Sequence, residues 1–394
     1  MQKIKILSVI PSFVLPSEVW MYRQLKFFAE NDLRIIAYQD LKRPEFSLPS
    51  ATVIEVPAES SSPLRGWRRT WDRIIAPKLA GPRFGAAHRR WLREQIESYE
   101  PDMIHCQYGT YGLSTLYVAK PLGVPVFVQF NGHDLSCFIQ RKRPRQQLIN
   151  ALNDFRGLVT VANYQRNWLL RHGADADRVT MIPYGAPKET RILRLHTTET
   201  TCRFLMVGRL CEMKSPLQAI RAFHQCAQAH RDSRLAIIGD GELRGEVTAL
   251  VSSLGLESKV RLLGVQPPNV VRDEMLNADV FVQHSITAAN GTQEGWPVAI
   301  GEAMSRGLPI VSTRHAGIVQ QVVPGVNGWL CNEHDWPTMA AQMLDLATHP
   351  ERRARMGRRS AQMALDSEKQ SALQFEFMCE RCGLSQTKSQ SIAA

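Results

Sequence analysis

Short apolar runs alternate with helical stretches along most of the chain, and they form two successive series. In the first half we predict strands at Ile4–Ile10, Leu33–Tyr38, Thr52–Val56, Met103–Cys106, Val126–Phe130 and Gly157–Val161, with Thr180–Gly185 closing the series. In the second half we predict strands within Cys202–Leu210, Arg234–Gly241, Lys259–Gly264, Val280–Ser285 and Leu308–Thr313. Alternation of this kind is typical of α/β domains with parallel sheets.

The length favours two such domains in tandem, because 394 residues exceed what one ordinary core contains. We interpret the polar stretch from Ala186 to Thr201 as the boundary between the two domains. We therefore expect a first domain at 1–186, a linker at 187–200 and a second domain at 201–370. A C-terminal helix at 371–384 is expected to pack back on the first domain, followed by a disordered tail at 385–394.

Composition narrows the partners and the compartment. The net charge of +11 points to anionic partners, namely nucleic acid, membrane lipid or phosphate-bearing small molecules. Eight scattered cysteines fit a reducing compartment, and the one C-x-x-C, Cys379 to Cys382, lacks the second pair of a zinc site. We expect no transmembrane helix and read Ile4–Ile10 as a buried strand rather than a signal peptide.

Several chemical motifs are missing or weak. The turn after the first strand, "PSFVLPSE", has no G-x-G-x-x-G, and the chain has no P-loop, G-x-S-x-G or H-E-x-x-H motif. Gly239, Gly241 and Gly245 follow a strand but have the wrong spacing for a dinucleotide site. Asp175–Asp177 forms a D-x-D that we interpret as a solvated loop, since a hard cation needs further oxygen ligands.

Two cations in "GRLCEMKSP" are placed to bind phosphate. Arg209 and Lys214 lie in a loop between a strand and a helix for which Ser215 is the expected N-cap and Pro216 the first helical residue. An Arg fork and a Lys point charge beside a helix N-terminus suit a diphosphate. The alternative is two solvated surface cations, which are common in a chain this basic.

Two glutamates in "QEGWPVAIGEAMSRGLPIV" flank the start of another helix. Pro297 is placed in the first turn, so Glu294 falls in the preceding loop and Glu302 about one and a half turns along. Carboxylates can accept hydrogen bonds from vicinal hydroxyls of a ribose or hexose. One dipole-favouring and one solvated glutamate is the simpler alternative, and an acid pair of a retaining glycosidase is a third.

These segments resemble the retaining, sugar-nucleotide-dependent glycosyltransferases of family 4, also called group 1. "GTQEGWPVAIGEAMSRGLPIVSTRHAGI" is similar to their E-x7-E region and "VGRLCEMKSP" to their phosphate-binding loop. "VRLLG", "IPYGAP" and "FNGHDLS" also have counterparts, and "PSEVWMYRQL" resembles the loop and helix of exopolysaccharide and colanic-acid-type transferases. The resemblance spans most of the chain and implies the GT-B fold, an α/β architecture of two Rossmann-like doubly wound domains facing across a cleft.

The resemblance also implies roles for individual residues. Glu302 would bind the ribose of the donor nucleotide, Glu294 the donor sugar, and Arg209 with Lys214 the diphosphate. His133 would lie near the reacting carbon, although a loop histidine bonded to Asp134 is the alternative. Further donor contacts are implied for the following residues: Gly295, Trp296, Pro297, Val298, Leu263 and Gly264.

The expected activity is retaining transfer of a hexosyl unit from a UDP- or GDP-sugar to a hydroxyl of a lipid-linked saccharide or other glycan, in bacterial surface polysaccharide biosynthesis. No cofactor or metal is expected. An epimerase of the same fold is the alternative. The chain departs from the family pattern at Gln320, where a glutamate is usual, and in the glycine-poor "PSFVLPSE" turn.

Basic residues concentrate in the first domain. Nine arginines and lysines lie between Leu64 and Arg93 among Trp67, Trp71, Phe84 and Trp91, and "RKRPR" adds a second cluster at 141–145. We interpret the stretch at 64–93 as a surface for anionic membrane, which places the protein in the cytoplasm with peripheral contact at the inner face of the plasma membrane. The alternatives are a solvated helix face and nucleic acid, for which no known module is evident.

Overall fold

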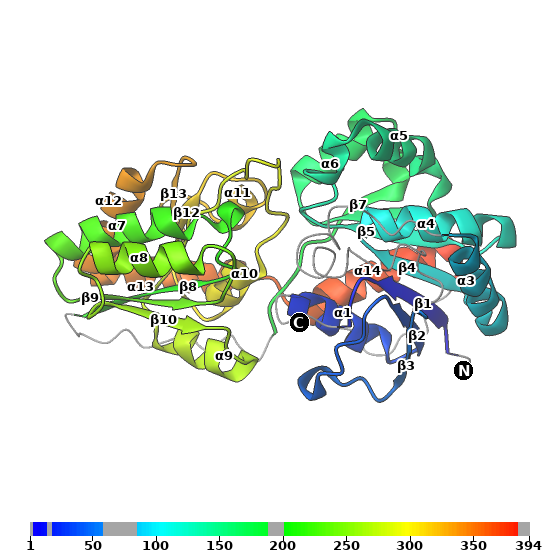
Figure 1. Cartoon of the computed structure of the whole chain (residues 1–394), viewed down its shortest axis with the longest axis horizontal. Coiled ribbons are helices and arrows are strands. Elements are labelled where there is room, and N and C mark those ends of the chain that lie inside the picture. Colours follow the sequence, from blue (N-terminus) through cyan, green and yellow to red (C-terminus); the bar gives the residue numbers. More distant parts are fainter. Residues whose placement is uncertain (1–2, 14–17, 58–84, 188–200, 385–394) are drawn as a thin grey trace. The chain divides into compact units, whose positions relative to one another are not determined.

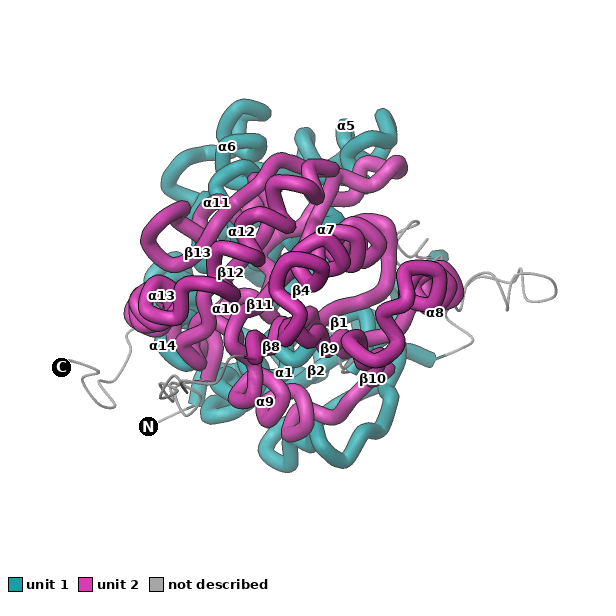
Figure 2. Tube along the Cα trace, turned by 90° about the vertical axis from the view of Figure 1, so that its left-hand side faces the viewer, with its two compact units in different colours: residues 1–183, 368–394 teal, residues 184–367 magenta. Residues whose placement is uncertain are grey.

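A computed structural model describes residues 3–13, 18–57, 85–187 and 201–384 of the chain (Figure 1). Contacts divide the chain into two compact units, which Figure 2 draws in different colours. Unit 1 comprises Met1–Pro183 and Glu368–Ala394, and unit 2 comprises Tyr184–Ser367. Apart from Pro187, the predicted linker and the tail from 385 onward lie outside the described residues, as does the basic stretch from 64 to 84.

Unit 1 contains a seven-stranded parallel sheet in the order β3-β2-β1-β4-β5-β6-β7. Its strands are β1 (Lys5–Ile10), β2 (Asp32–Ala37), β3 (Ala51–Glu55), β4 (Met103–Gln107), β5 (Val126–Phe130), β6 (Gly157–Thr160) and β7 (Val179–Met181). Its helices are α1 (Val19–Phe28), α3 (Ala86–Tyr99), α4 (Gly109–Ala119), α5 (Lys142–Ala151), α6 (Asn163–Arg171) and α14 (Ser367–Cys382).

The two faces of this sheet differ in polarity. Alternate residues of a strand point to opposite faces, so Ile104 and Cys106 of β4 enter an apolar cluster with α3, α4 and α5. On the other face, Gln107 and Gln129 lie with His105 and are fully buried. The Gln374 side chain of α14 donates to Gln129 Oε1 at 3.1 Å, and Gln24 of α1 donates to the same oxygen at 2.9 Å. Hydrogen bonds between amides thus join the last helix to the first sheet.

Unit 2 contains a six-stranded parallel sheet in the order β10-β9-β8-β11-β12-β13. Its strands are β8 (Cys202–Val207), β9 (Ser233–Ile238), β10 (Val260–Gly264), β11 (Val280–Gln283), β12 (Ile310–Thr313) and β13 (Gly328–Cys331). Its helices are α7 (Pro216–Ala229), α8 (Arg244–Ser253), α9 (Pro268–Asn277), α10 (Val298–Ser305), α11 (Ile318–Gln321), α12 (Trp336–Thr348) and α13 (Pro350–Met363).

Both faces of this second sheet are apolar. Phe204 and Met206 of β8 pack with α7, α8 and α12, whereas Leu205 packs on the other face with α9 and α10. Continuous apolar strands are what a parallel sheet covered on both sides requires. The predicted fold class, two Rossmann-like α/β sheets, is therefore confirmed, although β13 was not among the predicted strands. Within the described ranges, every helix is too short or too polar to cross a lipid bilayer.

Glycines allow the strand ends of unit 2 to approach closely. Gly239 has a φ of +135°, and a Cβ there would lie 1.9 Å from the carbonyl oxygen of Gly208. Its N–H donates to Gly264 O at 2.8 Å, and the N–H of Gly208 donates to Ile238 O at 2.9 Å. The end of β8, and with it the loop that begins at Arg209, is thereby fixed against the end of β9.

We expect Gly239→Ala to lower the free energy of unfolding by more than about 1 kcal/mol, because the added methyl meets backbone and the φ is unfavourable for alanine. Gly245→Ala is the matched control, since nothing lies within 4 Å of a Cβ there and the residue is helical. Urea unfolding of the full chain checks this. Equal midpoints for the two variants would contradict it.

Candidate functional site

The carboxyl ends of β8 and β11 define the site in unit 2. From β8 the chain adds β9 and β10 on one side of the sheet and then β11, β12 and β13 on the other. The loops after the neighbouring strands β8 and β11 therefore lead away in opposite directions. In doubly wound sheets this reversal of strand order is where ligands bind. The loop 208–215 follows β8 and the loop 284–297 follows β11, so both sequence-predicted motifs meet here.

The first loop reaches α7 through a tight turn. Leu210 donates its N–H to Asp240 O at 2.9 Å, and Ser215 donates to Glu212 O at 2.9 Å. Ser215 precedes the helix and Pro216 begins it, as predicted. Ser215 is thus the N-cap, but it has a left-handed backbone (φ 39°) and its hydroxyl makes no capping hydrogen bond.

Lys214 and Glu294 form an ion pair that the sequence analysis did not anticipate. Lys214 Nζ lies 2.5 Å from Glu294 Oε1, and the side chains are only 13% and 9% exposed. The same carboxylate oxygen accepts from Ser285 Oγ and from Gln283 Nε2, each at 3.3 Å. The sequence predicts Lys214 and Glu294 as separate ligands of the donor, whereas the fold brings them into direct contact.

Arg209 differs from Lys214 in its surroundings. Its residue is exposed, and its side chain makes no hydrogen bond or ion pair with any residue in the described part of the chain. The site therefore combines one compensated cation, Lys214, with one that faces solvent and carries an uncompensated charge. A phosphate would find a guanidinium ready to bind there.

Backbone N–H groups at the start of α10 are available to a ligand. The helix begins at Val298, with Pro297 as its N-cap rather than in its first turn, and ends at Ser305. Within the described ranges, the N–H groups of Gly295, Trp296 and Val298 make no hydrogen bond to the protein. Such groups at a helix N-terminus favour an anion or a sugar oxygen.

Glu302 lies further along α10 and is partly exposed, unlike the buried Glu294. Trp296, between the two glutamates, lines a pocket of unit 2 together with Met304, Gln320 and other residues. Gln320, where the family pattern has glutamate, lines the same pocket as Trp296.

The end of β10 supplies the third set of predicted residues. Gly264 has a φ of +65°, and its carbonyl accepts the N–H of Gly239 at 2.8 Å. The carbonyl of Leu263 accepts from Gln266 Nε2 at 2.5 Å. Both carbonyls thus already have one donor, and each keeps a second lone pair for a ligand.

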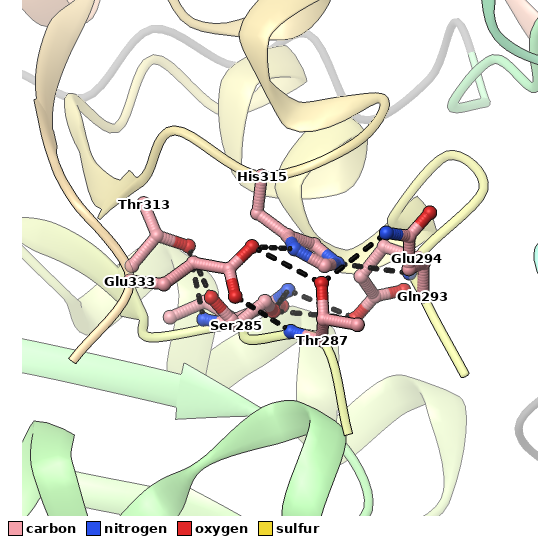
Figure 3. Close-up of polar contacts among 8 residues, drawn as sticks. Ser285, Thr287, Gln293, Glu294, Thr313, His315 and Glu333 are labelled. Atoms are coloured by element: carbon pink, nitrogen blue, oxygen red, sulfur yellow. Dashed lines mark hydrogen bonds and ion pairs between the residues drawn. The ribbon is translucent and has the colours of Figure 1, made fainter. Parts of the chain in front are cut away.

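Sequence reasoning missed His315 and Glu333, which support the loop carrying Glu294 (Figure 3). The N–H of Glu294 donates to His315 Nε2 at 3.1 Å, and His315 Nδ1 lies 2.6 Å from Glu333 Oε1. Burial alone would raise the pKa of Glu333, but hydrogen bonds from His315 and Thr287 outweigh it and hold the pKa below its usual value. The Glu333 side chain therefore acts as a carboxylate that accepts hydrogen bonds from His315 and Thr287.

His133 belongs to unit 1, in the turn after β5. The neighbouring Asp134 is fully buried and accepts the N–H groups of Gly109 at 2.9 Å and Asn131 at 2.8 Å. Burial raises the pKa of Asp134 to about 7, although both hydrogen bonds act to lower it. Tyr108, before Gly109, donates to the buried Glu18 at 3.0 Å. Polar side chains therefore also gather at the carboxyl ends of the unit 1 strands.

Metal ligation has no support among the described residues. No group of three or more His, Cys, Asp or Glu side chains there is arranged to bind a metal ion. Asp175 and Asp177 of the D-x-D segment instead form a local turn, in which Asp175 Oδ1 accepts the N–H of Asp177 at 3.1 Å.

Comparisons with known proteins show which family the chain resembles. The family model described as "Glycosyl transferase 4-like domain" matches residues 32–185, and the one described as "Glycosyl transferases group 1" matches residues 190–363. The amylovoran biosynthesis glycosyltransferase AmsK of Erwinia amylovora is 29% identical over 70% of this chain and 72% of its own. The putative colanic acid biosynthesis glycosyltransferase WcaL of Escherichia coli K12 is 27% identical over 75% and 74%.

Among solved structures, Anabaena HepE in complex with UDP-glucose has a TM-score of 0.73 at 16% identity and covers 95% of this chain and 100% of its own. Two Rossmann-like sheets in one chain with this similarity show the GT-B fold. The chain belongs to the group 1 glycosyltransferases, and it is a glycosyltransferase. The predicted family is thus confirmed.

A double-mutant cycle tests the ion pair. We expect Lys214→Met to lower the free energy of unfolding by about 3 kcal/mol, because it leaves the Glu294 carboxylate buried without its cation. Adding Glu294→Gln should restore at least about 1 kcal/mol of this loss. The exposed pair Arg93–Glu97 is the control and should show a coupling below about 0.5 kcal/mol. Additive effects at Lys214 and Glu294 would contradict the pairing.

Proposed function

We propose that the protein is a retaining hexosyltransferase that uses a nucleoside diphosphate sugar. The observation that carries this proposal is the Lys214–Glu294 pair at the strand reversal of unit 2, beside the uncompensated Arg209. In this proposal Arg209 and Lys214 bind the diphosphate, Glu294 contacts the sugar, and Glu302 binds the ribose. Leu263, Gly264 and the segment Gly295–Val298 complete the donor site.

The chemistry follows from the charges. The bond between the anomeric carbon and the diphosphate oxygen breaks, and its electron pair leaves with the diphosphate. Arg209 and Lys214 stabilise that developing negative charge, so no strong general acid is required. The acceptor hydroxyl oxygen then bonds to the anomeric carbon on the same face of the sugar, and the hydroxyl proton passes to the departing diphosphate oxygen. In this proposal His133 lies near the reacting carbon. No metal ion enters this scheme.

The acceptor is proposed to be a lipid-linked saccharide or another glycan of a bacterial surface polysaccharide. Two relatives named for amylovoran and colanic acid biosynthesis support this choice. UDP and GDP remain the two proposed donor nucleotides, and complexes of HepE with UDP and UDP-glucose favour the first. A sugar-nucleotide epimerase would use the same donor residues, but the named relatives favour transfer.

The donor site can be tested by binding and turnover. We expect UDP or GDP to raise the melting temperature in a panel with ADP and TDP, since a ligand that binds the native state stabilises it. Arg209→Ala and Lys214→Ala should each lower kcat by about 100-fold, the cost of one charge-stabilising donor. A chelator should leave turnover unchanged, and the products should retain the anomeric configuration.

Arg221→Ala, an exposed position on α7, is the matched control and should keep full activity. Normal turnover by Arg209→Ala or Lys214→Ala would remove the proposed role of the cation concerned. Conversion of the nucleotide sugar to an isomer without any acceptor would support the epimerase instead.

A membrane surface in unit 1 is the second part of the proposal. We define the basic surface as Tyr117 with the exposed cations Arg89, Arg90 and Arg93 of α3 and Arg141, Lys142, Arg143 and Arg145 of α5. The guanidinium of Arg89 lies 5.4 Å from the ring centroid of Tyr117, which is 70% exposed. Helices α3 and α5 both pack on α4, which places these side chains over one face of the sheet. Cations interleaved with an exposed aromatic ring suit anionic headgroups at the cytoplasmic face.

Flotation with phosphatidylserine vesicles tests the basic surface. We expect the protein to float at low salt and to dissociate as salt rises, because each cation near an anionic surface contributes about 1 kcal/mol that salt screens. Changing the four cations at 141–145 to serine should reduce flotation at least tenfold. Changing the exposed Arg355, Arg358 and Arg359 of α13 in unit 2 to serine removes three charges elsewhere and is the control. If the wild type does not float at low salt, the membrane proposal is wrong.

A further inference from the structure

Glu333, His315 and the backbone of Glu294 form a continuous chain of hydrogen bonds. Glu333 follows β13, His315 follows β12, and Glu294 lies in the loop after β11, so the chain crosses the carboxyl ends of three neighbouring strands. His315 is only 1% exposed, and Figure 3 shows its ring between the Glu333 carboxylate and the backbone of Glu294.

The direction of these hydrogen bonds determines the tautomer of His315. A backbone N–H can only donate, so the 3.1 Å contact from Glu294 N requires Nε2 to accept. The proton of the neutral ring must then be on Nδ1, from which it is donated to Glu333 Oε1 at 2.6 Å. The Glu333 carboxylate thus selects the form of the imidazole that can accept from Glu294.

Glu333 also binds the start of the same loop, at Thr287. Its Oε2 accepts the N–H of Thr287 at 2.8 Å, while Gln293 Nε2 donates to Thr287 Oγ1 at 3.2 Å. The start and the end of the 284–297 loop are therefore both attached to one carboxylate, directly at Thr287 and through His315 at Glu294.

The ring contacts the peptide of Glu294 and not its carboxylate. That carboxylate faces Lys214 and Ser285 on the other side, at 2.5 Å and 3.3 Å. His315 is thus placed to orient Glu294 rather than to exchange a proton with it.

We propose that His315 and Glu333 are positioning residues that fix the backbone of Glu294, and through it the contact between Glu294 and the sugar of the donor. This inference rests on the proposed function, in which Glu294 binds the donor sugar. It assigns the specificity for the sugar part of the donor to a hydrogen-bonded support that reaches from the end of β13.

Two substitutions of His315 separate its two hydrogen bonds. The side-chain oxygen of Gln can take the place of Nε2 and accept from Glu294, whereas the amide of Asn reaches only the place of Nδ1 and can donate only to Glu333. We expect His315→Asn to lower kcat/KM for the nucleotide sugar about tenfold or more, as expected when a buried donor loses its acceptor. His315→Gln should stay within about threefold of the wild type.

Binding measurements supply a readout that a general loss of stability would not move. His315→Asn should bind UDP or GDP, whichever stabilises the wild type, with an unchanged Kd and bind the corresponding nucleotide sugar about tenfold more weakly. His349→Asn, on the half-exposed residue between α12 and α13, is the control and should match the wild type in all assays.

Equal activities of His315→Asn and His315→Gln, or an equal loss of nucleotide and nucleotide-sugar binding, would overturn the inference. If the wild type neither binds a nucleotide nor transfers a sugar, the proposed function fails instead. Should His315→Asn not fold, ¹⁵N NMR of the wild-type imidazole decides: protonation at Nδ1 supports the inference, and protonation at Nε2 overturns it.

Discussion

A carboxylate that is almost wholly buried needs a cation, and for Glu294 that cation is Lys214. The pair joins the loop after β8 to the loop after β11, across the one place where the strand order of unit 2 reverses. Desolvating two charges is costly unless further hydrogen bonds compensate. Ser285 and Gln283 provide them, and the backbone of the same glutamate is bonded to His315.

The two glutamates that stand out in the sequence therefore differ in kind. Glu294 lies in a loop, is buried and is already charge-compensated, whereas Glu302 lies on a helix and is partly exposed. In the acid pair of a glycosidase both carboxylates would have to reach one bond, whereas one oxygen of Glu294 is already paired with Lys214.

Much of the fold could be predicted because buried parallel strands have apolar sequences, and each predicted strand lies close to an observed one. The observed strand that was not predicted is β13, "GWLC", which has four residues and begins at a glycine whose Cβ would lie 2.0 Å from Ile310 O. Missing this strand had a consequence for the site. Glu333 follows β13, so without that strand nothing in the sequence placed its carboxylate beside His315.

The Arg209 and Lys214 motif was recognisable because both cations lie within one loop. Their relation to Glu294 was not, since an ion pair between residues so far apart in sequence depends on strand order. Strand order in turn depends on how the helices pack on each face, which periodicity does not encode. The left-handed backbone at Ser215 was equally hidden, because serine rarely adopts it.

The side-chain amides that join α14 to the first sheet limit how segments of such proteins can be exchanged between relatives. Unit 1 is made of two separate pieces of chain, Met1–Pro183 and Glu368–Ala394, so a gene fragment ending near residue 183 would expose Gln107 and Gln129 to water or to the wrong partners. A chimaera that exchanges unit 1 between relatives would need two junctions. The helix at the end of the chain must be inherited together with the sheet at its beginning.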